Sequence, residues 1–140
     1  MSEPSVPEGY TYEPSPSAYV NHMGKVYQRR STDANGQEIV SAALRIEPHH
    51  VNTWGLAHGS LIAGMAEVGC AGTAYVADGP PVVAVEISTQ FIGAPKLGEL
   101  LEVHGWTTRR TRTLVFTQCR GESDGKLVFT ATSVQKIVGA

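Results

Sequence analysis

Charged residues are scarce in this chain. They make up 17% of the 140 residues, whereas about 25% is typical of a soluble domain. Eleven Lys and Arg stand against 13 Asp and Glu, which gives a formal net charge of −2. Because nucleic-acid-binding domains usually carry a basic stripe, this balance argues against that class. A chain this short buries only part of its surface alone, so sparse charge also hints at surface covered by subunit contacts.

Cysteines and long apolar runs are also few. Cys70 and Cys119 are the two cysteines, and they form neither a CxxC pair nor a disulfide framework. Free thiols suit a reducing cytosol, so we expect a cytoplasmic protein. The longest apolar run, residues 61–68, falls far short of the ~20 residues that span a bilayer. The start, MSEPSVPEGY, lacks the basic and apolar regions of a secretory signal. No Cys/His metal-ligand spacing, P-loop or GxGxxG is present, so no cofactor is expected.

Proline gathers at the N-terminus. Residues 1–17 hold four of the eight prolines, so we expect residues 1–20 to form an arm that is mobile or draped over the surface. Tyr10, Tyr12 and Tyr19 could pin part of it. Residues 21–140 are expected to form a single domain.

One long helix is predicted over residues 58–77. The segment has no proline and is apolar nearly all round, which is typical of a buried helix. Its four glycines, Gly59, Gly64, Gly69 and Gly72, would each weaken an isolated helix by about 1 kcal/mol relative to Ala. They make sense if other parts of the protein pack closely against it. Residues 78–81, Asp-Gly-Pro-Pro, end the helix.

Strand patterns surround the helix. Residues 24–31 and 37–47 flank an Asn-Gly turn, a strong hairpin signal, and Pro48 ends the second strand. Strands are also expected at 82–92, 99–109, 113–120 and 127–137, with a second hairpin turn at Ser123-Asp124-Gly125. The order β-β-α-β-β-β-β predicts an α+β fold in which an antiparallel sheet of five to six strands curls around one helix.

Glu67 is the one acid within the apolar helix. Burial raises the pKa of a carboxyl group, and an unpaired buried charge costs several kcal/mol. Such a group is neutralised, paired or functional. A hydrogen-bonded acid at a subunit seam is the structural alternative.

The helix begins at His58-Gly59-Ser60. Free backbone N–H groups at a helix start bind developing negative charge, and glycine allows close approach of a carbonyl. These residues could form an oxyanion hole; alternatively, His58 only caps the helix. Gly59 and Glu67 lie ~12 Å apart along one helix, so they can act on the same carbonyl only across a two-fold axis. An enzyme here must therefore be a dimer.

Other polar residues leave alternatives open. Asn52 could bind a carbonyl or water, or simply cap its loop. Arg109, Arg110 and Arg112 could meet phosphates, or form a solvated turn. His104, like His22, His49 and His50, shows no partner spacing and is interpreted as an ordinary residue. Ser60 lacks a GxSxG elbow, which argues against a serine hydrolase.

Taken together, the motifs resemble the hotdog-fold acyl-CoA thioesterases of the PaaI-like (4-hydroxybenzoyl-CoA thioesterase-like) family. That family's pattern is Asn-x-x-Gly-x-x-His-Gly-Gly, with an acid nine positions after the His. This chain carries Asn52-x-x-Gly55-x-x-His58-Gly59-Ser60 and then Glu67. The resemblance covers roughly residues 37–138.

The resemblance implies hydrolysis of a small, medium-chain or aromatic acyl-CoA. Glu67 would be general base or nucleophile, and the Gly59 N–H of a neighbouring subunit would polarise the carbonyl. Asn52 would orient water or carbonyl, and His58 would shape the turn. Ser60 would contact substrate, and the three arginines would meet the coenzyme A phosphates. A homodimer or a dimer-of-dimers tetramer is implied.

Some positions depart from the family pattern. Ser60 replaces the second Gly, Ala84 stands where many relatives carry Ser or Thr, and Thr111 stands where Gly is common. A non-catalytic acyl-CoA or small-ligand binding protein on the same fold is therefore the alternative. A dehydratase would need a His acting with an acid, and no such placement is evident.

Overall fold

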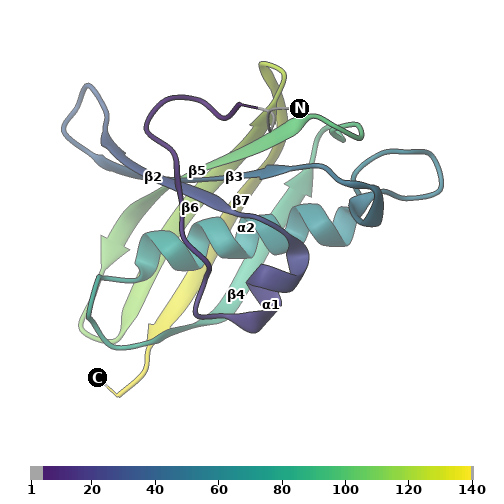
Figure 1. Ribbon diagram of the computed structural model, residues 1–140. Helices are drawn as coiled ribbons and strands as arrows, with labels where there is room; N and C mark the ends of the chain where they lie inside the picture. The colour runs from purple at the N-terminus through teal and green to yellow at the C-terminus, as the bar shows by residue number, and fades with distance from the viewer. Residues whose placement is uncertain (1–4, 140) are drawn as a thin grey trace.

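A single long helix packs against one face of a seven-stranded antiparallel sheet (Figure 1). The computed structural model describes residues 5–139. The elements are β1 (Thr11–Tyr12), α1 (Ala18–Met23), β2 (Tyr27–Thr32), β3 (Glu38–Arg45), a 3-10 turn (Pro48–His50), α2 (Gly59–Ala74), β4 (Val82–Phe91), β5 (Leu100–Arg110), β6 (Leu114–Ser123) and β7 (Lys126–Ile137). Along the sheet the strands follow the order β1-β2-β3-β5-β6-β7-β4. The predicted α+β arrangement is confirmed.

The sequence prediction undercounted the strands. It gave five to six, and the structure has seven because the two-residue β1 pairs with β2 through Thr11–Gln28 and Tyr12–Tyr27. A two-residue strand is too short to show the alternation of apolar and polar residues that predicts the longer strands. The six longer strands lie within about three residues of the predicted positions, and the β2–β3 and β6–β7 hairpins are confirmed.

α2 is three residues shorter at its C-terminus than predicted, ending at Ala74. Beyond it Tyr75 and Val76 are exposed, so continuing the helix would bury nothing. Its sheet-facing side is buried at Leu61, Met65, Cys70 and other positions. The expected close packing at glycine is confirmed at Gly69, where a Cβ would lie 2.5 Å from Val103 Cγ1.

The N-terminal segment contains elements that the sequence did not reveal. Ser17 caps α1, accepting a hydrogen bond from the Val20 N–H at 3.4 Å. Met23 at the end of α1 packs beside Gly64 of α2. Tyr10 is buried and donates a hydrogen bond to Glu102 at 2.9 Å. The segment is therefore held against both the sheet and α2.

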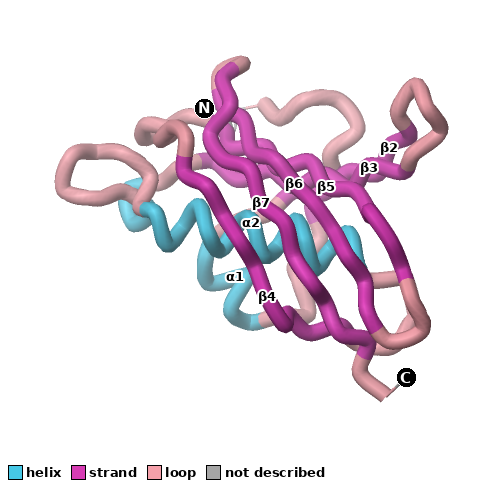
Figure 2. The backbone as a smooth tube through the Cα atoms, turned by 180° about the vertical axis from the view of Figure 1, so that it is seen from behind, coloured by secondary structure: helices cyan, strands magenta, loops and turns pink. Residues whose placement is uncertain are grey.

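Among residues 5–139, β4 pairs only with β7 and forms one edge of the sheet (Figure 2). Its apolar side chains Val83, Val85 and Phe91 are each at least half exposed. An exposed apolar edge strand is a ready template for pairing with another chain. No helix among the described residues is long and apolar enough to cross a membrane.

Candidate active site

Asn52 organises the turn that leads into α2. Its Oδ1 accepts hydrogen bonds from the Trp54 N–H (2.9 Å) and the Leu56 N–H (3.2 Å). Gly55 completes the turn at φ +76°, a left-handed conformation that suits glycine. Within residues 5–139 the Asn52 Nδ2 donors have no partner, so the side chain builds the loop and still offers two N–H groups.

His58 is the N-cap of α2. Its Nδ1 accepts hydrogen bonds from the Ser60 N–H (3.0 Å) and the Ser60 hydroxyl (2.8 Å). Nδ1 is therefore the unprotonated ring nitrogen, and one of the free N–H groups of the helix start is satisfied. The predicted turn-shaping role of His58 fits this geometry, and the Ser60 hydroxyl points back to the cap.

Gly59 retains a free N–H. Leu61 and Ile62 donate to the His58 carbonyl, but no acceptor for the Gly59 N–H exists in the described part of the chain. Gly59 is exposed, and a Cβ there would touch only Phe91, at 3.9 Å. The first N–H of α2 is thus open to an incoming oxygen, as an oxyanion site requires.

Glu67 lies two turns further along α2. It is half-buried, and among residues 5–139 its carboxylate has no hydrogen-bond partner. Burial raises the pKa of this carboxyl group above its ordinary value. A carboxylate with this environment is a stronger base than an exposed one, and nothing within the described chain uses it for structure.

The three arginines lie at the opposite end of α2, where β5 turns into β6. Arg110 donates a hydrogen bond to the Ala74 carbonyl at 2.6 Å and so caps the helix C-terminus. Arg109 and Arg112 are exposed. Thr111 Oγ1 accepts from the Leu114 N–H at 3.0 Å. The structure therefore gathers Asn52 with the helix start and leaves the arginines remote from it in one chain.

Comparison with known proteins identifies the family of this chain. The family model described as the thioesterase superfamily matches residues 55–129. The chain belongs to the thioesterase superfamily. The expected thioester hydrolase is confirmed at the level of this family.

Individual relatives span the same domain. A curated Pseudomonas aeruginosa protein, whose name gives it provisionally as an esterase, is 33% identical over 132 residues, covering 93% of this chain and 96% of its own. The Escherichia coli PaaI protein from the phenylacetic acid degradation operon superposes with TM-score 0.77 at 14% identity, covering 89% and 87%. A Streptococcus pneumoniae hypothetical thioesterase solved with coenzyme A gives 0.68 at 20%, covering 81% and 89%. The resemblance to hotdog thioesterases is thus confirmed.

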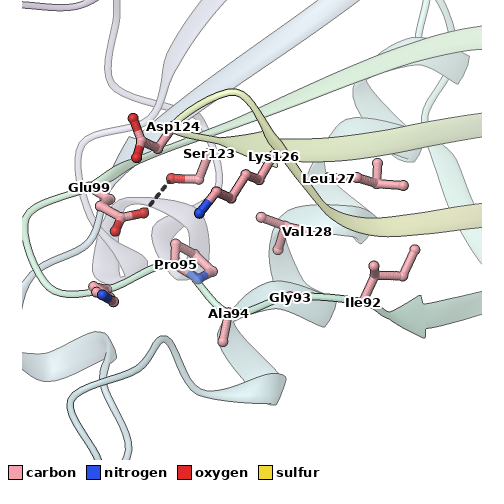
Figure 3. A pocket seen from close by; sticks show the side chains of 11 residues that line it. Ile92, Gly93, Ala94, Pro95, Glu99, Ser123, Asp124, Lys126, Leu127 and Val128 are labelled. Atoms are coloured by element: carbon pink, nitrogen blue, oxygen red, sulfur yellow. Dashed lines mark hydrogen bonds between the residues drawn. The ribbon is translucent and has the colours of Figure 1, made fainter.

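The structure of this thioesterase has one hollow at the helix start and another beyond the end of β4. One, of about 460 Å³, lies between α1 and α2 and is lined by Tyr19, Met23, Leu61 and His58 among others. The other, of about 310 Å³, lies between the loop after β4 and the β6–β7 turn (Figure 3).

The two hollows differ in chemistry. In the second, Lys96 and Lys126 are balanced by Glu99 and Asp124, so it has no excess charge to attract a polyanion. Glu99 accepts a hydrogen bond there from Ser123 at 3.0 Å. The α1–α2 cleft is the one bordered by the helix cap.

One cluster was missed from the sequence. His104, interpreted as an ordinary strand residue, lies 2.7 Å from Ser41 Oγ and 3.1 Å from Glu122 Oε1. That interpretation was wrong because the partners lie on β3 and β6, and only the strand register brings them together. The sequence did contain one signal of this cluster: Glu102 and His104 are two residues apart on a predicted strand, so their side chains lie on the same face.

Proposed function

We propose that this thioesterase hydrolyses acyl-CoA thioesters with a small, medium-chain or aromatic acyl group, at composite sites formed by two chains. The proposal rests on one observation: α2 carries both an open N–H, at Gly59, and an unpartnered, half-buried carboxylate, at Glu67. Their separation of ~12 Å along the axis prevents one chain from using both on one carbonyl.

The exposed edge of β4 supports the dimer. Two β4 strands pairing antiparallel across a two-fold axis would satisfy the unpaired backbone groups of this edge and bring Val83, Val85 and Phe91 next to the partner chain. The same axis would set two α2 helices antiparallel, so that Glu67 of each chain faces the helix start of the other. Two equivalent sites result, in a dimer or in a dimer of dimers.

Each residue has a defined task in this mechanism. The Gly59 N–H, at the positive end of the helix, stabilises the oxygen of the tetrahedral intermediate. As general base, Glu67 takes a proton from water, which adds to the carbonyl and displaces the coenzyme A thiolate. As nucleophile, Glu67 attacks the carbonyl itself and displaces the thiolate to form an anhydride that water then cleaves. The free amide of Asn52 orients the water or the carbonyl, and the α1–α2 cleft accommodates the acyl group.

The coenzyme A portion extends toward Arg109 and Arg112, which are exposed at the C-terminal end of α2. In the antiparallel dimer this end lies beyond the partner's helix start. The coenzyme A bound to the Streptococcus pneumoniae relative supports coenzyme A as the thiol part of the substrate. The two buried free thiols, Cys70 and Cys119, fit a reducing cytoplasm.

Steady-state hydrolysis of an acyl-CoA panel by Glu67→Gln and Glu67→Ala tests the proposal. We expect kcat to fall by about 10²–10⁴-fold in both variants, while Glu13→Gln, an exposed acid on the N-terminal segment, retains wild-type turnover. Unchanged turnover in both Glu67 variants would overturn the mechanism. Saturable acyl-CoA binding without hydrolysis by the wild type would instead favour the binding protein that Ser60 and Ala84 suggest.

A single-turnover reaction in ¹⁸O water distinguishes the two roles of Glu67. Label enters the Glu67 carboxylate only if Glu67 is the nucleophile, and not if it is the general base.

A further inference from the structure

Three side chains with metal-ligand atoms converge on the face of the sheet that points away from α2. On β5, Val103 and Gly105 approach Gly69 and Thr73 of the helix. Because side chains alternate along a strand, Glu102 and His104 face the opposite side. There His104 Nε2 lies 3.1 Å from Glu122 Oε1 and 3.9 Å from Glu102 Oε2. All three ligand atoms lie within 4.8 Å of one another.

The two carboxylates oppose each other directly across β5 and β6, since Glu102 pairs with Glu122 in the strand register. Like charges in this position destabilise a sheet. The ion pairs that the described residues show for these two carboxylates are both with His104. A cation between the three groups would turn the repulsion into attraction.

Neighbouring hydroxyl groups orient the cluster. Ser41 Oγ lies 2.7 Å from His104 Nδ1, so Nδ1–H can donate to it and leave the Nε2 lone pair directed at the carboxylates. Metal-bound histidines commonly have such a partner on the second nitrogen. Tyr10 donates to Glu102 Oε2 at 2.9 Å.

We propose that Glu102, His104 and Glu122 bind a divalent transition-metal ion of the Zn²⁺ class. One imidazole nitrogen and two carboxylate oxygens are common ligands for such ions. Two ligands of a tetrahedral Zn²⁺ are about 3.4 Å apart, given bonds of about 2.1 Å, and the observed 3.1 and 3.9 Å bracket that spacing. A divalent ion also balances both carboxylates, whereas a protonated imidazole would balance one.

The site is accessible yet partly shielded. The His104 side chain is 14% exposed and that of Glu122 is 37% exposed. A hollow of about 500 Å³, lined by Gln37, Trp106 and Arg120 among others, opens beside His104. It gives an ion a way in and leaves room for a water ligand. The ion would tie β5 to β6 and, through Tyr10, to the N-terminal segment, on the sheet face opposite Glu67.

Calorimetric titration of the EDTA-treated, desalted full-length protein with ZnCl₂ tests the proposal. We expect one Zn²⁺ per chain, no binding at this site in His104→Ala, and at least tenfold weaker binding in Glu122→Gln. Tyr10→Phe should weaken binding about tenfold, because Glu102 is no longer held in place. His22→Ala, which removes an exposed histidine on α1, is the matched control and should bind like the wild type.

Thermal unfolding gives a second readout, because Zn²⁺ should raise the Tm of the wild type and of His22→Ala but not of His104→Ala. If His104→Ala fails to fold, Glu122→Gln decides, since its amide preserves the shape of the side chain. Absence of Zn²⁺ binding, or binding undiminished in Glu122→Gln, would overturn the proposal.

Discussion

Gly59 and Glu67 lie on the same helix, about 12 Å apart along its axis. Reacting atoms in an enzyme are held about 3–3.5 Å from each other. An open N–H at the helix start and an unpartnered carboxylate two turns later therefore cannot act on the same carbonyl within one chain. The distance that separates them in one chain is what makes a two-chain site the simplest account of both.

The raised pKa of Glu67 predicts a stability cost at neutral pH. Since the pKa is higher in the folded than in the unfolded chain, the folded state binds the extra proton, and stability falls as pH rises from the ordinary carboxyl range through the folded pKa. Glu67→Gln should thus have a higher Tm than the wild type at pH 7 and lose that advantage below about pH 4. Calorimetric Tm values from pH 4 to 8 test this. An advantage of constant size at every pH would contradict it.

The N–H of Gly59 can be removed with little disturbance. Proline is tolerated at the first position of a helix, and His58 already has φ −64° and ψ 143°, as a residue before proline requires. Gly59→Pro should lower kcat about 10²–10³-fold with a nearly unchanged Tm. Gly59→Ala retains the N–H, so it serves as the control and should stay within a few-fold of wild type. Equal losses in both variants would point to steric effects.

Substitutions should distinguish the arginines that bind phosphate from the arginine that caps α2. Arg109→Ala and Arg112→Ala are expected to raise KM for acyl-CoA about tenfold, since a hydrogen bond to a charged group contributes about 1.5–3 kcal/mol. KM for the matching N-acetylcysteamine thioester, which lacks the nucleotide, should not change. For Arg110→Ala we expect the free energy of unfolding to fall by about 1 kcal/mol, because this variant loses the hydrogen bond to the Ala74 carbonyl. Equal KM effects on both substrates would exclude phosphate binding.

Local sequence patterns were sufficient for most of the fold. The apolar stretch from residue 59 fixed α2, and the Asn-Gly and Asp-Gly turns fixed two hairpins. α1 could not be predicted because a six-residue helix has little intrinsic stability and depends on the Ser17 cap and the packing of Met23 on Gly64.

The candidate site was predictable where it is local in sequence. The free backbone N–H groups at the predicted helix start, His58-Gly59, suggested an oxyanion hole, and the family resemblance added Asn52 to the site. Arg110 and His104 depend on partners that are distant in sequence: Ala74 lies 36 residues from Arg110, and Ser41 and Glu122 lie 63 and 18 residues from His104. Such pairs follow from strand register and helix placement, which no short motif encodes.

Activity of a mixed dimer tests the two-chain site most directly. Glu67→Gln and Gly59→Pro chains, co-expressed with different tags and purified by both, would give heterodimers with one intact and one doubly disabled site. Both homodimers should be almost inactive, and the heterodimer should recover about half of the wild-type kcat per dimer. A heterodimer no more active than either homodimer would contradict the two-chain site.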